Sequence, residues 1–218
     1  MSQSKQGGSV QRALASLVGK PAFWLTWVLV LMIGVVGRSM ARELPKPPQL
    51  KLALPAFHLV DQDGKPFGSS DLVGKIWVAD FIFTSCPTVC PKLTERMVRI
   101  QHRTRNLGDA FHLVSFTVDP ENDTPEKLRA FASLYHPNMR RWSFVTGSLA
   151  DIEGTVIKGF KIAMGKEETA PGLFGIFHGE RFVLVDQQGA IRGYYENSDE
   201  SIDKLMLDIS ILANMPGS

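Results

Sequence analysis

Residues 75–91 read Lys-Ile-Trp-Val-Ala-Asp-Phe-Ile-Phe-Thr-Ser-Cys-Pro-Thr-Val-Cys-Pro, and they set the architecture of the whole chain. Residues 75–83 form a nearly continuous apolar run of strand length, as expected for a central strand buried on both faces. Pro91 suits the first turn of a helix, and apolar residues then recur at helical spacing as far as Gly108. The stretch predicts a buried strand, a loop with two cysteines, and a helix over residues 92–106.

Further strands and helices are expected on both sides of this unit. A short hairpin is expected at residues 57–67, where Asp63-Gly64 can form a tight turn. Thr124-Pro125 is a typical helix start. The other expected elements are strands at residues 111–119, 142–146, 181–186 and 190–195, and helices at residues 125–136, 148–160 and 200–213. Alternating strands and helices closed by a hairpin predict a three-layer α/β fold around a central mixed sheet.

The two cysteines of the chain, Cys86 and Cys90, lie in the predicted loop and at the start of the helix. A disulfide between them would close so short a loop that it would stabilise the fold by only about 2 kcal/mol. Free N–H groups and partial positive charge at a helix N-terminus favour the thiolate at Cys90 and also at Cys86. Pro87 and Pro91 follow directly and restrict the loop. The pattern therefore indicates metal ligands or nucleophiles rather than two cysteines buried for packing.

An uncharged, largely apolar run, residues 22–37, lies near the N-terminus between Lys20 and Arg38. A helix of this length spans about 24 Å, slightly less than a hydrocarbon core, and the flanking cations can snorkel to lengthen the span. The run predicts a single membrane anchor. A cleaved signal peptide is the alternative, because Ser39-Met40-Ala41 is an acceptable cleavage site after a positively charged start.

The predicted organisation has four parts: a basic segment at residues 1–21, an anchor or uncleaved signal at 22–38, a proline-rich linker at 39–54 and a globular domain at 55–215. A proline-rich linker is stiff and holds the domain away from the membrane. In either case the globular domain is expected to be exported.

The distribution of charge argues against nucleic-acid binding. The chain of 218 residues has a formal charge of +2, but residues 1–51 carry seven Lys and Arg against the single acid Glu43. Residues 52–218 carry 17 basic and 21 acidic residues, a net charge of −4. A mildly acidic domain lacks the positive surface that a phosphate backbone requires. No nucleic-acid partner is therefore expected.

Three motifs in register give the chain a family resemblance. They are residues 83–91 with the two cysteines, residues 118–125 (Val-Asp-Pro-Glu-Asn-Asp-Thr-Pro), and His178, eleven residues before the turn glycine Gly189. Together they resemble the Sco/SenC family of thioredoxin-like copper proteins over residues 52–213. A cysteine motif alone would be weak, but three motifs in the right order and spacing across one domain are specific.

The resemblance implies a thioredoxin-like fold in which Cys86, Cys90 and His178 hold copper. It also implies a metallochaperone that helps to assemble the binuclear copper centre of cytochrome c oxidase. The expected partner is the copper-bearing subunit of that oxidase or another copper enzyme, reached from the extracytoplasmic side of the inner membrane. Many relatives have an acidic residue where this chain has Thr88, and often another where it has Phe177.

The ligand chemistry supports copper independently. Two thiolates and one imidazole suit Cu(I), with an open position for transfer to a partner. Structural zinc normally takes four protein ligands, so copper is favoured unless Asp119 coordinates. Asp119 ends a strand at the same sheet edge as Cys86, although it also fits an ordinary turn into a helix. A Gly- and Pro-containing loop at residues 165–175, before His178, is expected to be able to fold over the site.

Two other functions remain open at this stage. The first is a thiol-disulfide oxidoreductase that reduces client cysteines before metallation, which the same dithiol could perform between rounds of copper binding. Thioredoxin-type enzymes, however, use two cysteines separated by two residues and a proline before the penultimate strand, where this chain has His178. The second is a peroxidase, but peroxiredoxins need Thr or Ser three residues before the reactive cysteine, where this chain has Phe83.

Overall fold

The computed structural model describes residues 20–40, 46–170, 173–178 and 180–215, with the backbone alone over 166–170 and 173–178. The chain divides into two compact units, residues 1–46 and 47–218.

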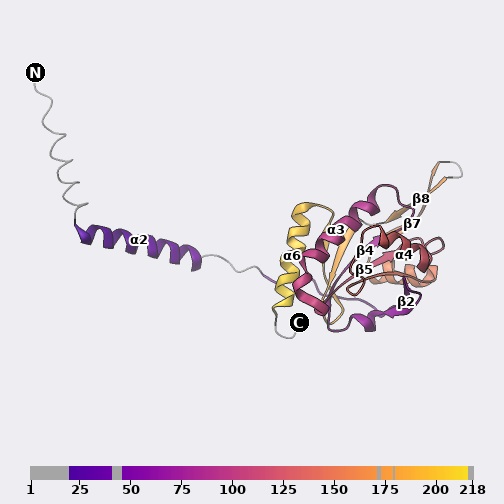
Figure 1. Cartoon of the computed structure of the whole chain (residues 1–218), viewed down its shortest axis with the longest axis horizontal. Coiled ribbons are helices and arrows are strands. Elements are labelled where there is room, and N and C mark those ends of the chain that lie inside the picture. The colour runs from indigo at the N-terminus through magenta and orange to yellow at the C-terminus, as the bar shows by residue number, and fades with distance from the viewer. Residues whose placement is uncertain (1–19, 41–45, 171–172, 179, 216–218) are drawn as a thin grey trace, which may run out of the picture. The chain divides into compact units, whose positions relative to one another are not determined.

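The larger unit is built on a mixed sheet, shown in Figure 1, which has eight strands among the described residues in the order β1-β10-β9-β4-β5-β6-β2-β3. β4, β5 and β6 are parallel neighbours, whereas β9 pairs antiparallel with β4, and β2 with β6. Parallel neighbours require crossovers, which α3 and α4 provide. The strands are β1 (Leu52–Ala53), β2 (His58–Asp61), β3 (Pro66–Gly68), β4 (Ile76–Ile82), β5 (Phe111–Thr117), β6 (Trp142–Thr146), β9 (Arg181–Val185) and β10 (Ala190–Glu196).

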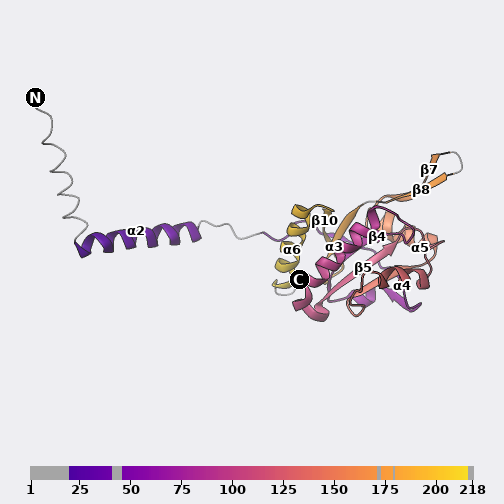
Figure 2. The same ribbon diagram turned by 45° about the horizontal axis from the view of Figure 1, so that its top comes forward.

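Helices cover both faces of this sheet, so every residue of β4 and β5 is buried. One face packs against α3 (Val89–Arg103), α4 (Pro125–Ser133) and α6 (Asp199–Ala213), and the other packs against α5 (Leu149–Glu153) and the π-helical segment Gly154–Gly159. Short 3-10 turns lie at Ser69–Leu72 and Arg105–Ala110. Figures 1 and 2 show α3 and α6 side by side over the sheet. The three-layer α/β fold with a central mixed sheet is confirmed.

Two expected elements differ from the structure. The described residues of the expected loop are strands: β7 (Met164–Ala170) and β8 (Leu173–His178) form a separate antiparallel hairpin that projects from the body of the larger unit in Figures 1 and 2. The expected helix at 148–160 is α-helical only as far as Glu153. The chain then widens into the π-helical segment between Gly154 and Gly159, because glycine holds an α-helical backbone weakly.

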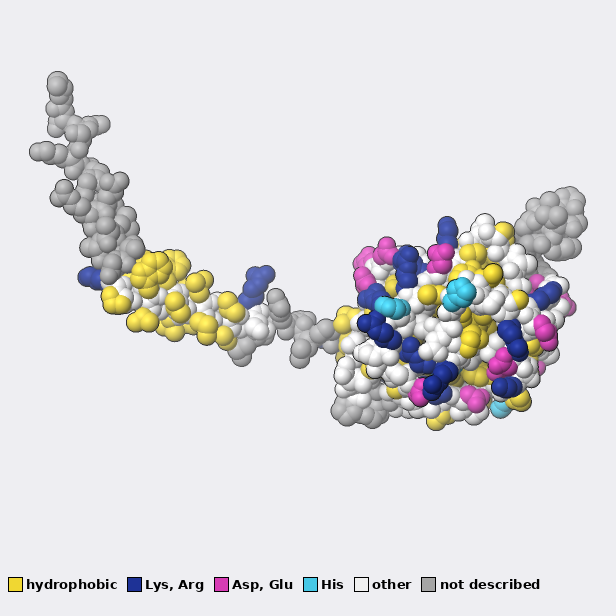
Figure 3. Space-filling view, viewed as in Figure 1, with side chains coloured by type: hydrophobic (Ala, Val, Ile, Leu, Met, Phe, Trp, Pro, Cys, Tyr) yellow, Lys and Arg dark blue, Asp and Glu magenta, His cyan; other side chains and the backbone are white. Residues whose placement is uncertain are grey.

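The smaller unit contains α2 (Pro21–Met40), which corresponds to the predicted anchor. Residues 21–39 have a mean hydropathy of 1.7 and are long and apolar enough to cross a membrane, a test that a signal sequence also passes. Figure 3 shows apolar side chains along α2 and basic side chains at its two ends.

The second half of the predicted linker, residues 47–54, belongs to the larger unit. β1 pairs with β10, and the guanidinium of Arg192 donates to the carbonyl oxygens of Pro48 (2.7 Å) and Leu50 (2.9 Å). Arg192 also forms an ion pair of 3.0 Å with the fully buried Asp186. Residues 47–54 of the predicted 39–54 linker are therefore fixed to the larger unit.

Candidate metal and thiol site

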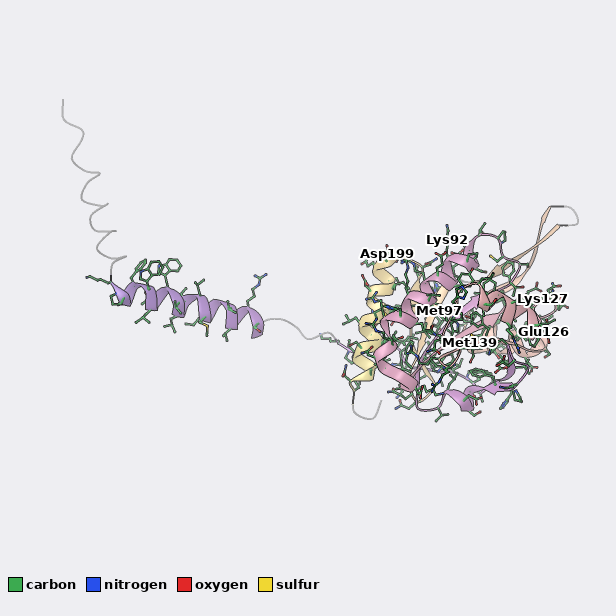
Figure 4. The ribbon with its side chains drawn as sticks, viewed as in Figure 1. Lys92, Met97, Glu126, Lys127, Met139 and Asp199 are labelled. Carbon is green, nitrogen blue, oxygen red and sulfur yellow. The ribbon has the colours of Figure 1, made fainter. Side chains whose placement is uncertain are left out.

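The two cysteines lie where β4 gives way to α3, at the carboxyl edge of the parallel strands. The Cys86 N–H donates to the Phe83 carbonyl at 3.2 Å, which closes a tight turn, and the Cys90 N–H donates to the Cys86 sulfur at 3.3 Å. Cys86 is 9% exposed, Cys90 is fully buried, and neither forms a disulfide. Lys92, labelled in Figure 4, marks this end of α3. The loop therefore places both sulfurs within hydrogen-bonding reach of each other.

The two thiols differ in acidity. Burial opposes ionisation of Cys86, but hydrogen bonds from the N–H and thiol of Cys90 and from the N–H groups of Thr88 and Val89 outweigh it, so the pKa of Cys86 is lowered. Burial, the hydrogen bond to Cys86 and the negative charges of Cys86 and Asp80 raise the pKa of Cys90. The expectation that the helix terminus favours the thiolate at both cysteines agrees with the lowered pKa of Cys86 but is wrong for Cys90. Cys86 ionises first, and Cys90 keeps its proton.

Asp80 is a buried carboxyl on the face of β4 that looks toward α3, in line with Val78 and Ile82. Within the described part of the chain, neither of its carboxylate oxygens has a hydrogen-bond partner at normal distance. Burial raises the pKa of Asp80 to about 7, against smaller opposing effects of the Ser115 hydroxyl and its own N–H. An acid that titrates near neutral pH thus lies close enough to influence Cys90.

Asp123 ties the cysteine loop to the segment after β5. Its carboxylate accepts hydrogen bonds from the N–H of Thr84 (3.0 Å), the hydroxyl of Thr84 (2.5 Å) and the hydroxyl of Thr117 (2.6 Å). Asp123 is 1% exposed, so these bonds are shielded from water. Two loops that are distant in sequence are therefore held together at the edge that carries the thiols.

Asp119 organises the turn that leads into α4. Its N–H donates to the Thr117 hydroxyl, its carbonyl accepts from the N–H groups of Asn122 and Asp123, and its Oδ2 accepts from the Asn122 amide at 2.8 Å. Over the residues whose side chains are described, no three His, Cys, Asp or Glu are grouped so that they could hold a metal ion. Coordination by Asp119 stays a prediction.

His178 is the last residue of β8, and its backbone pairs with Met164. Its side chain falls outside the described residues, so its place as the third ligand also stays a prediction.

Sequence reasoning missed Asp80 and the role of Asp123. A detectable signal existed for Asp80, which is the one charge within the otherwise apolar residues 76–83. Asp123 lies inside the quoted motif at residues 118–125, but its partners Thr84 and Thr117 become evident only when parallel strands bring the two loops together.

The chain matches the family model described as SCO1/SenC over residues 46–214. The SCO1 protein homolog of Bacillus subtilis (strain 168) is 36% identical over 155 residues, which are 70% of this chain and 79% of that protein. The SCO2-like protein RT0576 of Rickettsia typhi is 30% identical over 180 residues, which are 77% of this chain and 86% of that protein.

Solved structures show the same architecture. The SCO1/SenC family lipoprotein from Bacillus anthracis is 37% identical with a TM-score of 0.69, over 79% of this chain and 100% of that chain. BsSco is described as a member of the Sco family of cytochrome c oxidase assembly proteins with a disulfide switch. It is 32% identical with a TM-score of 0.67, over 80% of this chain and 100% of that chain. Bradyrhizobium japonicum ScoI with copper bound shares the fold at 24% identity and a TM-score of 0.64, over 73% of this chain and 99% of that chain. The thioredoxin-like fold class is confirmed.

Proposed function

The chain belongs to the SCO1/SenC family, and on this premise we propose that it is a membrane-anchored metallochaperone that delivers copper to, or prepares, the binuclear copper site of cytochrome c oxidase. The observation that carries the proposal is the pair of adjacent thiols, Cys86 and Cys90, at the junction of β4 and α3, which form no disulfide. Membership of the family that includes BsSco, a cytochrome c oxidase assembly protein by description, supports this client.

The donor set fits copper. Two adjacent sulfurs, one with a lowered pKa, are soft ligands that prefer Cu(I), and deprotonation of Cys86 is already favoured before metal arrives. We assign Cys86 and Cys90 as the principal ligands and His178 as the third, with Asp119 as a possible addition. Burial of Cys90 and near-burial of Cys86 shield a bound ion from water and from oxidants.

The proposed location is the inner membrane, with a single span at residues 22–38 and the larger unit on the extracytoplasmic side. The length and hydropathy of α2 support the span. The description of the relative from Bacillus anthracis as a lipoprotein supports a membrane-attached domain in this family.

Copper titration of the full chain in detergent tests the proposal. We expect one Cu(I) per reduced chain, and none after the dithiol is oxidised. Cys86→Ser and Cys90→Ser should each abolish tight binding, whereas Ser85→Ala, beside Cys86 and exposed, serves as the matched control. Undiminished stoichiometric binding by the double serine variant would refute the proposal.

His178→Ala should weaken Cu(II) more than Cu(I), because two thiolates can hold the monovalent ion while the divalent ion needs further ligands. The sulfur-to-Cu(II) absorption should shift or disappear. If it is unchanged, and His136→Ala removes it instead, the third ligand is wrongly assigned.

A thiol-disulfide oxidoreductase is the second candidate, and the unequal acidity of the two thiols favours it. A thiolate at Cys86 can attack a client disulfide, and the buried Cys90 can then resolve the mixed disulfide by displacing the client thiol. The disulfide switch described for BsSco is consistent with such chemistry. Reduction of one equivalent of a disulfide-bonded peptide by the reduced, copper-free chain, with oxidation of Cys86 and Cys90 to a disulfide, would support this candidate if it is lost in Cys86→Ser.

A further inference from the structure

A cavity lies at the opposite end of the parallel strands from the cysteines. It has a volume of about 340 Å³ and is lined by Lys75, Asp109, His112, Arg140 and Arg141. Lys75 directly precedes β4, His112 is the second residue of β5, and Arg141 directly precedes β6. The amino ends of three parallel strands therefore bring three cations and one acid to the same cavity.

Two of the lining side chains are held in place by the fold. Arg141 is 8% exposed, and its guanidinium donates to the carbonyl oxygens of Thr104 (3.1 Å) and Gln101 (3.5 Å) at the end of α3. His112 is 7% exposed, and its Nε2 lies 3.0 Å from the Ser143 hydroxyl. A guanidinium has more N–H donors than Arg141 uses in these bonds. The cavity thus has a rigid polar wall with donor capacity to spare.

The electrostatic field in the cavity is positive. Burial, together with the charges of Lys75 and Arg141, lowers the pKa of His112 to about 4, and Asp71 opposes this only in part. Its imidazole is therefore neutral at physiological pH, and the positive charge comes from Lys75, Arg140 and Arg141 against Asp109 and the nearby Asp71. The buried Arg141, the partly exposed Lys75 and the exposed Arg140 together favour an oxyanion, and guanidinium groups match phosphate geometry especially well.

The same end of the sheet receives the chain from α2. The N–H of Gly74, next to Lys75, donates to Gln187, and the N–H of Leu54 donates to Gly189 in the same hairpin turn (3.0 and 3.2 Å). Between Met40 and Pro47 the chain can extend at most about 25 Å. If α2 anchors the chain in a membrane, the anchor raises the effective concentration of lipid headgroups around the larger unit that carries this cavity.

We propose that the cavity lined by Lys75, His112, Arg140 and Arg141 binds the phosphate group of an anionic membrane lipid. This inference rests on the membrane anchor of the proposed function and adds an orientation to it. β4 is seven residues long, so about 20 Å separate the cavity from the cysteine loop. In Figure 4, Met139, next to Arg140, lies apart from Lys92, which marks the cysteine end of α3. Binding lipid at one end leaves the thiols at the other end open to a client.

Amide hydrogen exchange of the full chain in nanodiscs tests this proposal. Nanodiscs of phosphatidylcholine are compared with nanodiscs that also contain phosphatidylglycerol, and the readout is exchange over residues 105–112 and 138–141. We expect severalfold slower exchange with phosphatidylglycerol, and loss of this difference in Lys75→Gln/Arg140→Gln. These two residues are chosen because Arg141 also caps α3, so its removal would endanger the fold. Lys127→Gln/Lys158→Gln, which removes the same charge from exposed sites, should behave as the wild type.

Each of the other outcomes overturns the proposal. Equal exchange in both nanodiscs would show that no anionic headgroup binds. Slower exchange that the control variant also loses would show only general attraction to a charged surface. Protection by inorganic phosphate, without any by phosphatidylglycerol, would assign the cavity to a free anion. Copper stoichiometry is measured on the same samples, so a failure of copper binding is seen separately from a failure of lipid binding.

Discussion

Cys86 and Cys90 acquire different acidities because different hydrogen-bond donors reach each sulfur. Three backbone N–H groups at the start of α3 act on Cys86, whereas Cys90 lies deeper and near the charge of Asp80. Both positions could be predicted from the sequence, since a cysteine pair before a helix is a visible pattern. The order of acidity could not, because it depends on which sulfur the loop turns toward those N–H groups.

Alkylation should therefore distinguish the two thiols. At neutral pH, iodoacetamide should modify Cys86 much faster than Cys90 in the reduced, copper-free chain, because the thiolate is the nucleophile and Cys90 is fully buried. Peptide mapping by mass spectrometry after short exposures measures both rates. Unfolded chain is the control, and there the two rates should converge. Faster modification of Cys90 in the folded chain would contradict the assignment.

Asp80 should make the stability of the domain depend on pH. Its folded pKa of about 7 lies above its ordinary value of 3.8, so the folded state holds the proton more tightly and stability falls as pH rises from about 4 to about 7. Between pH 5 and pH 8 this loss amounts to roughly 3 kcal/mol. Asp80→Asn should remove it and give a variant more stable than the wild type at pH 8.

Urea unfolding of the reduced, copper-free chain at both pH values measures this difference. The buried His112 also makes stability depend on pH, because its pKa is lowered from its ordinary value of 6.5, and it destabilises the fold as the pH falls below that value. The wild type and Asp80→Asn share this effect, so it cancels when their stabilities are compared. Asp203→Asn, at an exposed pair with Arg103, is the surface control and should keep the wild-type pH dependence. A parallel pH dependence in Asp80→Asn and wild type would contradict the burial argument.

At the scale of elements, the buried carboxylate of Asp123 links β4, its cysteine loop and the turn after β5. Asp123→Asn keeps the shape but exchanges one acceptor oxygen for an NH2 group that faces the hydroxyls of Thr84 and Thr117. We expect a loss of about 2 kcal/mol in unfolding free energy, because buried donors lose their acceptor. Residues 83–88 should also exchange their amide hydrogens faster, and copper should be released more readily.

Asp151→Asn offers a matched control for Asp123→Asn. Asp151 is exposed and accepts a hydrogen bond from Ser148 at the start of α5, far in sequence from the cysteine loop. The Asp151→Asn substitution should leave amide hydrogen exchange over residues 83–88 unchanged. If Asp123→Asn also leaves that exchange unchanged, the carboxylate does not hold the two loops together.

The elements that could be predicted are those with strong periodic patterns. β4, α3, β5, β6 and α6 lie close to their expected ranges, because burial on both faces gives apolar strands and burial on one face gives a helical stripe. The hairpin of β7 and β8 could not be predicted in this way. Its strands pair only with each other, and residues 166–169 are largely polar without alternation, so no burial pattern marks them.

At the scale of the whole molecule, the sequence predicts a basic N-terminal part and an acidic domain, and the structure places the boundary between its two units after Lys46. The linker could be recognised from its prolines. Its docked half could not, because the bonds that fix Pro48 and Leu50 come from Arg192, more than a hundred residues away. If α2 anchors the chain, the anchor raises the effective concentration of the larger unit at the membrane, which favours transfer to a membrane-bound client even at modest affinity.

Placement in the membrane is the prediction on which this tethering depends. α2 is apolar, uncharged between Lys20 and Arg38, and long enough to span, so the chain should remain with the membrane fraction after high-salt and carbonate washes and enter solution only with detergent. Protease added to intact spheroplasts should digest the larger unit, which would place it on the extracytoplasmic side. Mass spectrometry of the mature chain distinguishes a retained membrane anchor at α2 from a cleaved signal peptide. An N-terminus at Arg42 would show cleavage after Ala41 and release of the domain, and the anchor would be ruled out while copper binding by Cys86 and Cys90 stayed open to its own test.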